Sequence, residues 1–353
     1  MSTLLGPFRA IDHHFSITVD GDPGVDVGEV FAGLADADAT PESRYRVVMP
    51  PEPTVSDDGD RVVIGDLFDG DDLIASGNTR VLLQMLIARL AVRTSERPGP
   101  AFHASTVGDE RGAVLLVGPS RRGKSTFSAR LLMDGLALVA EDISAIDPPT
   151  GLVRPYHRPL GLSEASFKAL GVDIPPAAGA PCGCGGKVLI ADSHLGFSYR
   201  EAVPVKVVAF VDHERDDLVA VTPGRMLSDM LTEGVMVMTE APDAVEALID
   251  LVARSRCVHL GTGDLEQAAD WIDQLLDRAE PPTVPWFVQT RGDVTDLFVG
   301  SEAVVVGDGT AHHLNQSAAA IHLLATEGEG ADDIARELGL SVEEVETTLV
   351  ALG

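Results

Sequence analysis

The residues best suited to chemistry in this chain lie in the segment GPSRRGKS, residues 118–125. It fits the pattern G-x-x-x-x-G-K-S, in which backbone N–H groups and a helix N-terminus bind phosphate oxygens. Lys124 would add positive charge near the β- and γ-phosphates, and the Ser125 hydroxyl would be a ligand of Mg²⁺. The residues expected to bind the nucleotide are Gly118, Pro119, Ser120, Arg121, Arg122, Gly123, Lys124, Ser125 and Thr126.

Two carboxylates, Glu141 and Asp142, follow the apolar stretch LALVA that comes after this loop and its helix. A right-handed crossover makes that stretch parallel to the strand before the loop, so both strands end at the same edge of the sheet. One acid can then hold Mg²⁺ while the other accepts a proton from an attacking hydroxyl. The alternative is that both residues merely end a strand at the surface.

The loop needs a strand before it and a helix after it, and the sequence supplies both. GAVLLV predicts the strand, and a helix is expected from about Lys124 to Asp134, with Phe127, Leu131 and Leu132 toward the sheet. Strand and helix patterns continue to alternate through residues 98–280, for example VPVKVVAFVD and LEQAADWIDQLLDRA. The fold class is therefore α/β, with a mostly parallel or mixed sheet covered by helices.

The flanking regions have a different character. Residues 1–97 predict an α+β region of unknown role, with short strands such as FSITVDGDPG and RVVIGDLFDG and one helix, TRVLLQMLIARLAV. The segment AEPPTVP predicts a linker, which divides the chain into domains at 1–97, 98–280 and 281–353.

The last domain predicts a hairpin followed by three helices. Its hairpin, EAVVVGDGTAHHL, would turn at Asp308-Gly309. The final helix opens with Ser341 and Glu344 at capping-box spacing. Together these elements indicate a small winged-helix domain.

Composition excludes several classes of partner. The chain of 353 residues has 26 Lys and Arg against 55 Asp and Glu, a net charge of −29. Such a field repels phosphate backbones and anionic membranes, so neither a nucleic acid nor a membrane is an expected partner. No long apolar run or signal peptide is present, so we expect a cytoplasmic protein. Cys182, Cys184 and Cys257 are too few for a disulfide framework, and a single C-x-C pair is a weak zinc signal.

Four segments, FHASTV, LLVGPSRRGKST, LVAED and HRPLGL, together resemble the kinase domain of the HPr kinase/phosphorylase family. The resemblance spans roughly residues 98–240 and is strongest to the smaller relatives that act as serine kinases on ribosomally made peptide precursors. It implies ATP and Mg²⁺ as cofactors. It also implies a catalytic set of His103, Lys124, Glu141 and Asp142, with Glu141 as the base and Asp142 joining Ser125 at the metal.

The sequence departs from that family at two positions. Arg121 stands where the family usually has glycine, and Glu141 stands where it usually has aspartate. The segment used by the full-length enzymes to remove phosphate is not recognisable, so kinase rather than phosphorylase activity is expected.

Four further side chains are candidates for phosphate contact. Arg154, His157 and Arg158 would lie near the crevice, as phosphate ligands or as ordinary solvated side chains. Lys187 follows the glycine-rich segment PPAAGAPCGCGGK, which is either a closing loop or a plain connection.

Residues 286–353 resemble the PqqD-like peptide-binding domain, on their pattern of hairpin and helices. The resemblance implies that a leader peptide adds a strand to the exposed sheet edge and rests against the last helix. A DNA-binding winged helix is the alternative, but the acidic segments EGEGADD and SVEEVE disfavour it.

These features predict an ATP-dependent kinase that phosphorylates a Ser or Thr hydroxyl of a ribosomally made precursor peptide, whose leader is held by the C-terminal domain. Two alternatives stay open. One is a nucleotide-gated module that presents a peptide without kinase activity. The other is a small-molecule kinase, for which residues 286–353 would be superfluous. The sequence leaves the oligomeric state open.

Overall fold

A computed structural model describes most of the chain beyond residue 98 and parts of the chain before it. The described residues are 2–10, 13–20, 32–41, 43–48, 72–74, 99–174, 187–190, 192–233, 236–237, 242–307 and 310–352. Three expected features lie outside them: the strand in RVVIGDLFDG, the helix TRVLLQMLIARLAV and most of the glycine-rich segment before Lys187.

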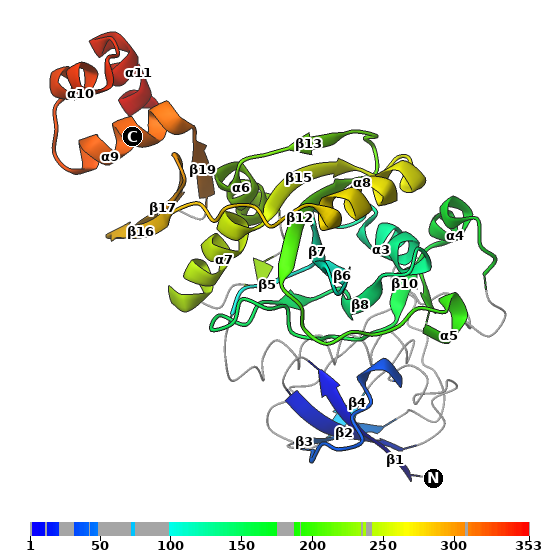
Figure 1. The fold of residues 1–353 in the computed structure, drawn as a ribbon. Helices are drawn as coiled ribbons and strands as arrows, with labels where there is room; N and C mark the ends of the chain where they lie inside the picture. The colour runs from blue at the N-terminus through cyan, green and yellow to red at the C-terminus, as the bar shows by residue number, and fades with distance from the viewer. Residues whose placement is uncertain are drawn as a thin grey trace, which may run out of the picture.

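A six-stranded mixed sheet forms the centre of the molecule (Figure 1). Its strands, in spatial order, are β13 (Leu218–Ala220), β15 (Arg256–Gly261), β12 (Val205–Asp212), β7 (Gly112–Val117), β6 (Ser105–Asp109) and β8 (Ala137–Ala140). The strands β15, β12 and β7 are parallel, while β6 runs antiparallel to both β7 and β8. The expected α/β class with a mixed sheet is therefore confirmed.

Helices cover both faces of this sheet because successive residues of its strands point to opposite sides. Leu116 packs in one apolar cluster with α3 (Lys124–Met133) and α8 (Leu265–Asp277). Leu115, the residue before it, packs in a second cluster with α6 (Pro223–Glu233) and α7 (Pro242–Arg254). The strand β7 is thus buried on both sides, which explains its unbroken apolar sequence.

Shorter elements surround the central sheet. Three strands form a small sheet, β5 (Ala101–Phe102), β9 (Ser144–Ala145) and β14 (Met236–Val237), and two form a pair, β10 (Leu160–Leu162) and β11 (Val188–Ile190). Two short helices follow these strands in the chain: α4 (Glu164–Leu170) comes after β10 and α5 (Asp192–Leu195) after β11.

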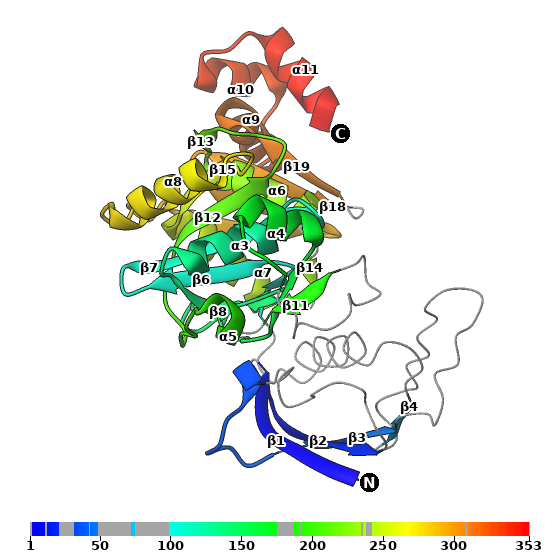
Figure 2. The same cartoon turned by 90° about the vertical axis from the view of Figure 1, so that its right-hand side faces the viewer.

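Within the described residues, the N-terminal unit contains a sheet of four strands below the central one (Figure 2). Its elements are β1 (Ser2–Ala10), β2 (His13–Asp20), the 3-10 helix η1 (Ala32–Leu34), β3 (Ser43–Val48) and β4 (Asp72–Ile74). Phe8, Phe15 and Leu34 are buried in the same apolar cluster as one face of the central sheet. The unit therefore shares a core with the α/β region.

The C-terminal unit has the hairpin and the three helices that the sequence predicts. Its elements are β16 (Trp286–Arg291), β17 (Val294–Val299), β18 (Glu302–Gly307), β19 (Thr310–Leu314), α9 (Gln316–Thr326), α10 (Ala331–Leu338) and α11 (Val342–Leu352). The predicted turn residues Asp308 and Gly309 lie outside the described residues. The Ser341 hydroxyl accepts from the Glu344 backbone N–H at 3.2 Å, and Glu344 accepts from the Ser341 N–H at 2.8 Å, so the predicted capping box is present.

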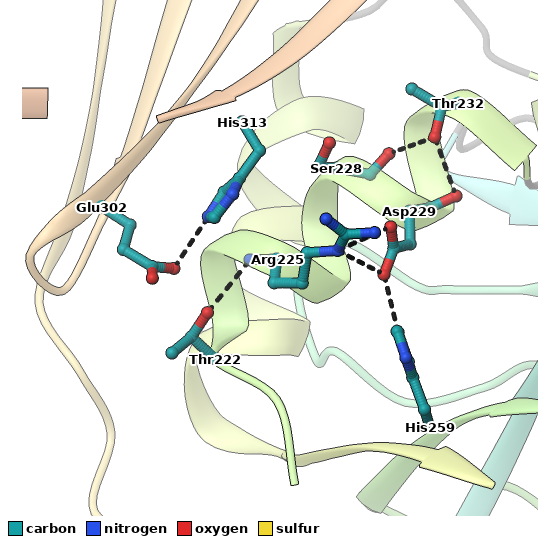
Figure 3. A network of polar contacts seen from close by, with 8 residues as sticks. All are labelled: Thr222, Arg225, Ser228, Asp229, Thr232, His259, Glu302 and His313. Carbon is teal, nitrogen blue, oxygen red and sulfur yellow. Dashed lines mark hydrogen bonds and ion pairs between the residues drawn. The ribbon is translucent and has the colours of Figure 1, made fainter. Parts of the chain in front are cut away.

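The C-terminal sheet is covered on both faces. Leu297 and Val299 of β17 pack in the cluster that includes α6 and α7, whereas Phe298 between them packs with α9. The ion pair between Glu302 and His313, 3.1 Å long, lies beside α6 (Figure 3).

The C-terminal part of the expected linker, at Val284, contacts the α/β region. The Val284 N–H donates to the carbonyl of Ala253 at 3.0 Å, and the Val284 side chain packs on the central core. The structure thus joins the C-terminal unit to the α/β region through packed apolar surface. In the part of the chain that the structure describes, no helix has the length and apolarity needed to cross a membrane.

Candidate active site

The phosphate loop joins β7 to α3, as its sequence motif requires. Gly118 has a φ of 134° and Gly123 a φ of 94°, a region that side chains with a Cβ rarely adopt. A Cβ on Gly118 would also lie 3.1 Å from the carbonyl oxygen of Val211 on β12. The two glycines therefore allow the bend and its close approach to the neighbouring strand.

Lys124 reaches back over the loop from the first position of α3. Its Nζ donates to the carbonyls of Gly118 at 2.8 Å and Pro119 at 2.9 Å. Burial lowers the pKa of Lys124 to about 8, although the charges of Glu141 and Asp142 act in the opposite direction. A phosphate bound in the loop would favour the charged form of this lysine.

The acidic pair follows β8, which is not the immediate neighbour of β7 in the sheet. The strand β6 lies between them, antiparallel to both, so β7 and β8 still run in the same direction and end at the same edge. The Ser125 hydroxyl donates to Oε1 of Glu141 at 2.7 Å. The crossover therefore brings the first acid to the phosphate loop, as expected.

Asp142 faces a different set of groups. Its Oδ1 lies 3.2 Å from Nδ1 of His103, and its Oδ2 accepts a charged hydrogen bond from Arg158. Burial alone would raise the pKa of Asp142, but the charge of Arg158 and the hydrogen bond from His103 outweigh it and hold the pKa well below its usual range. Asp142 is therefore a carboxylate at neutral pH.

The Ser125 hydroxyl bonds to Glu141, and the expectation that Ser125 and Asp142 together bind Mg²⁺ stays a prediction. Asp142 has a φ of 69°, in the left-handed region, whereas a residue that continued the extended strand would have a negative φ. The chain thus turns at Asp142, whose side chain lies against His103 and Arg158. Glu141 and Asp142 thus have separate partners.

A chain of buried hydroxyls connects α3 to the strand that carries the acids. Ser128 of α3 donates to Ser105 of β6 at 2.7 Å, and Ser105 donates to the carbonyl of Ala140 at 3.3 Å. Ala140 directly precedes Glu141. The small serine side chains let α3 approach β6 closely while satisfying each other's polar groups, so the loop and the acids are held in fixed relation.

The residues present fit a magnesium ion at Glu141. Its Oε2 is buried and has no hydrogen-bond partner in the described part of the chain, while its other oxygen bonds to the Ser125 hydroxyl. Carboxylate and hydroxyl oxygens beside bound phosphates are the ligands that Mg²⁺ commonly takes. Among the described residues, no group of three or more His, Cys, Asp or Glu side chains could hold a metal ion by itself.

The remaining sequence candidates divide into two groups. Arg158 joins the site through Asp142, and Lys187 is close enough to influence the pKa values of Lys124 and Asp142. Arg154 instead forms an ion pair with Asp147 at 3.0 Å. His157 contacts the carbonyl of Arg200 at 2.9 Å.

The loop residues flanking Gly123 make contacts with neighbouring elements. Thr126 donates to Ser166 of α4 at 2.8 Å. Arg122 lies 3.2 Å from Asp212 and 2.6 Å from Glu214. Arg121 is exposed and has a φ of 68°, so this position takes the left-handed conformation that the glycine usual in the resembling family would adopt at lower cost.

Sequence reasoning missed Asp212, which ends β12 beside the loop. Its Oδ1 accepts from Arg122 and, at 3.1 Å, from the N–H of Glu214. In the sequence, Asp212 is an acidic residue at the end of an apolar stretch, and that stretch forms a strand parallel to β7. Further acidic residues follow Asp212 closely. Without the strand order, the sequence does not indicate which of these acids lies beside the phosphate loop.

The cysteines give no support to a metal centre within the described chain. Cys182 and Cys184 lie outside the described residues. Cys257 is buried in β15, and burial raises its pKa to about 12. It is therefore a protonated core thiol at neutral pH.

Comparison with solved structures gives several distant structural likenesses. The chain is similar to the HPr(Ser) kinase/phosphatase from Coxiella burnetii, with a TM-score of 0.25 and 14% sequence identity, over 50% of this chain and 96% of that chain. No protein-family model matches the chain, and no curated protein matches it either. The TM-score is too low for this likeness to bear on function, so the function has to be inferred from the site.

Proposed function

We propose that the protein is a Mg²⁺- and ATP-dependent phosphotransferase that moves the γ-phosphoryl group of ATP to a hydroxyl acceptor. The observation that carries the proposal is the placement of two acids with different partners at one phosphate loop. Glu141 bonds to Ser125 of the loop, and Asp142 bonds to His103 and Arg158. A protein that only binds nucleotide has no need of the second, separately held carboxylate.

Each residue of the site has a distinct part in this reaction. The loop N–H groups and Lys124 bind the phosphates and stabilise the negative charge that develops on them. Glu141 and Ser125 would hold magnesium, which would neutralise charge on the β- and γ-phosphates. This assignment reverses the roles implied by the family resemblance, in which Glu141 is the base and Asp142 joins Ser125 at the metal.

Asp142 is the base in this proposal. The acceptor oxygen forms a bond to the γ-phosphorus, the bond from that phosphorus to the bridging oxygen of ADP breaks, and the hydroxyl proton passes to Asp142. His103 and Arg158 keep Asp142 ionised and oriented before the reaction. Arg158 also places a second positive charge where the transferred group would pass.

The test compares Lys124→Ala with Lys206→Ala as a matched control. Lys206 is a half-buried lysine whose Nζ bonds to the carbonyl of Leu276, away from the loop. Wild type and Lys206→Ala should bind Mg·ATP and release ADP, while Lys124→Ala should lose both functions with an unchanged circular dichroism spectrum. ADP release by Lys124→Ala at the wild-type rate would show that the phosphate loop takes no part in the reaction.

A precursor peptide is the acceptor class that we propose for this site. Its support is the C-terminal unit, where β16 pairs with β17 alone among the described strands and Phe287 on β16 is 47% exposed. An extended peptide could pair with that open edge and bring its hydroxyl into reach, which raises the local acceptor concentration. Phosphate found by mass spectrometry on a small metabolite but on no peptide would favour the small-molecule kinase instead.

A further inference from the structure

The N-terminal unit meets the α/β region beside the segment that carries Arg158. Tyr156 and Arg200 flank β8 on its two sides: the Tyr156 N–H donates to the carbonyl of Val139 at 2.9 Å, and the Arg200 N–H donates to that of Leu138 at 2.9 Å. We call residues 156–158 and 198–201 together the collar of β8. The collar leads directly into the active site, because its residue Arg158 pairs with Asp142.

His157 ties the two halves of the collar together. Its Nε2 lies 2.9 Å from the carbonyl of Arg200, and its ring stacks on Tyr199 with centroids 4.8 Å apart. Burial lowers the pKa of His157, although its hydrogen bonds to the backbone of Arg200 and of Gly33 act in the opposite direction. A shift of His157 would therefore move its neighbour Arg158.

The N-terminal unit contacts this collar at two places. Gly33 of η1 lies so close that an added Cβ would overlap the His157 carbonyl oxygen and would lie 2.6 Å from the Tyr199 hydroxyl. On β1, Nη2 of Arg9 donates to both carboxylate oxygens of Glu201, at 3.0 Å each. Apolar packing adds to both contacts, since Phe8, Leu34 and Tyr156 belong to one buried cluster.

We propose that the N-terminal unit is a positioning element for the catalytic acid: through Gly33 and Arg9 it holds the collar, and the collar holds Arg158 on Asp142. This inference rests on the proposed phosphotransfer, in which Asp142 is the base. It assigns a role to a region whose sequence suggests none. The phosphate loop makes none of these contacts, so nucleotide binding and phosphoryl transfer should respond differently when the contacts are disturbed.

The experiment uses Gly33→Ala in the full chain, with Gly330→Ala as a matched control. Both glycines have backbone angles outside the left-handed region, but Gly330 has open space around its Cβ position. The readouts are the dissociation constant of Mg·ATP and the rate of ADP formation with water as the acceptor. We expect Gly33→Ala to lower kcat about tenfold with an unchanged dissociation constant, because small misplacements of catalytic groups are costly. Gly330→Ala should match wild type.

A double-mutant cycle separates positioning from general loss of structure. In an Arg158→Lys background, Gly33→Ala should change kcat by less than about twofold, because the group that it displaces has already been altered. The same tenfold loss in both backgrounds would overturn the proposal, as would full kcat in Gly33→Ala. Wild type that binds ATP without forming ADP would instead contradict the proposed phosphotransfer.

A second pair of variants covers the case in which Gly33→Ala fails to fold. Arg9→Gln and Glu201→Gln each break the same exposed ion pair, which should cost little stability. Both should lower kcat by the same factor, about twofold, at an unchanged dissociation constant for Mg·ATP. Wild-type kcat in both variants would contradict a positioning role.

Discussion

The hydroxyl of Ser125 lies 2.7 Å from Oε1 of Glu141, although the two residues come from different ends of a strand–loop–helix–strand unit. This contact joins the phosphate loop to the first of two acids. The second acid, Asp142, has no part in it and faces His103 and Arg158. The separation of the two carboxylates is the basis of the chemistry that we propose.

Glu141→Gln should weaken the magnesium-dependent part of ATP binding. The neutral amide is a poorer Mg²⁺ ligand than a carboxylate, so we expect the affinity for Mg·ATP to fall about tenfold or more. The affinity for ATP in the presence of a chelator should stay the same. Isothermal titration calorimetry measures both values.

Asp134→Asn is the matched control for that change, because Asp134 is a surface acid at the end of α3 that pairs with Arg130. It should bind Mg·ATP as wild type does. An equal loss in both variants would show that net charge, and not the position of Glu141, governs affinity.

Leu297→Ala should destabilise the α/β region together with the C-terminal unit. Leu297 is buried where β17 packs on the cluster that includes α6 and α7, and truncating a buried leucine costs about 2–5 kcal/mol. We therefore expect denaturant unfolding followed by circular dichroism to remain one transition at a lower midpoint. Two separate transitions, with only the smaller one shifted, would mean that the C-terminal unit folds independently.

Asp229→Asn should reduce stability at neutral pH but not in acid. Asp229 of α6 contacts His259 at 2.7 Å and Arg225 at 3.0 Å (Figure 3). Burial works to raise the pKa of Asp229, but the hydrogen bond from His259 and the charge of Arg225 outweigh it and lower the pKa. A lowered carboxyl pKa stabilises the fold above the unfolded pKa of about 4, and this stabilisation is lost as pH falls through the folded pKa.

The asparagine mimics the protonated acid, so the two proteins should differ by about 1–3 kcal/mol at pH 7. The gap should begin to close as pH falls below about 4 and should vanish below the folded pKa of Asp229. Urea unfolding at several pH values measures the gap. Asp333→Asn, at an exposed pair with Arg336, should match wild type throughout. A gap for Asp229→Asn that is constant with pH would contradict this account.

The local elements of the site could be predicted from the sequence because each has a short-range cause. The loop motif, the apolar run of β7 and the buried face of α3 through Phe127 and Leu131 are all set within about twenty residues. The hairpin and three helices of the C-terminal unit are read from similar patterns. These predictions needed no knowledge of strand order.

Other features depend on long-range packing and could not be predicted. The sequence pattern of strand, loop, helix and strand is the same whether or not β6 lies between β7 and β8. The position of β6 could therefore not be predicted from that pattern. The turn at Asp142 is set by its partners, since Arg158 lies sixteen residues further along the chain. The fit of Gly33 against His157 joins residues that no local pattern connects.

The most direct test of the central claim is the rate of ADP formation from Mg·ATP by Asp142→Asn, measured together with its ATP dissociation constant. Removing a general base costs about 10²- to 10⁴-fold in rate. We predict a loss of that size with a dissociation constant equal to that of the wild type. Turnover by Asp142→Asn at the wild-type rate would contradict the proposal that this carboxylate accepts the proton during phosphoryl transfer.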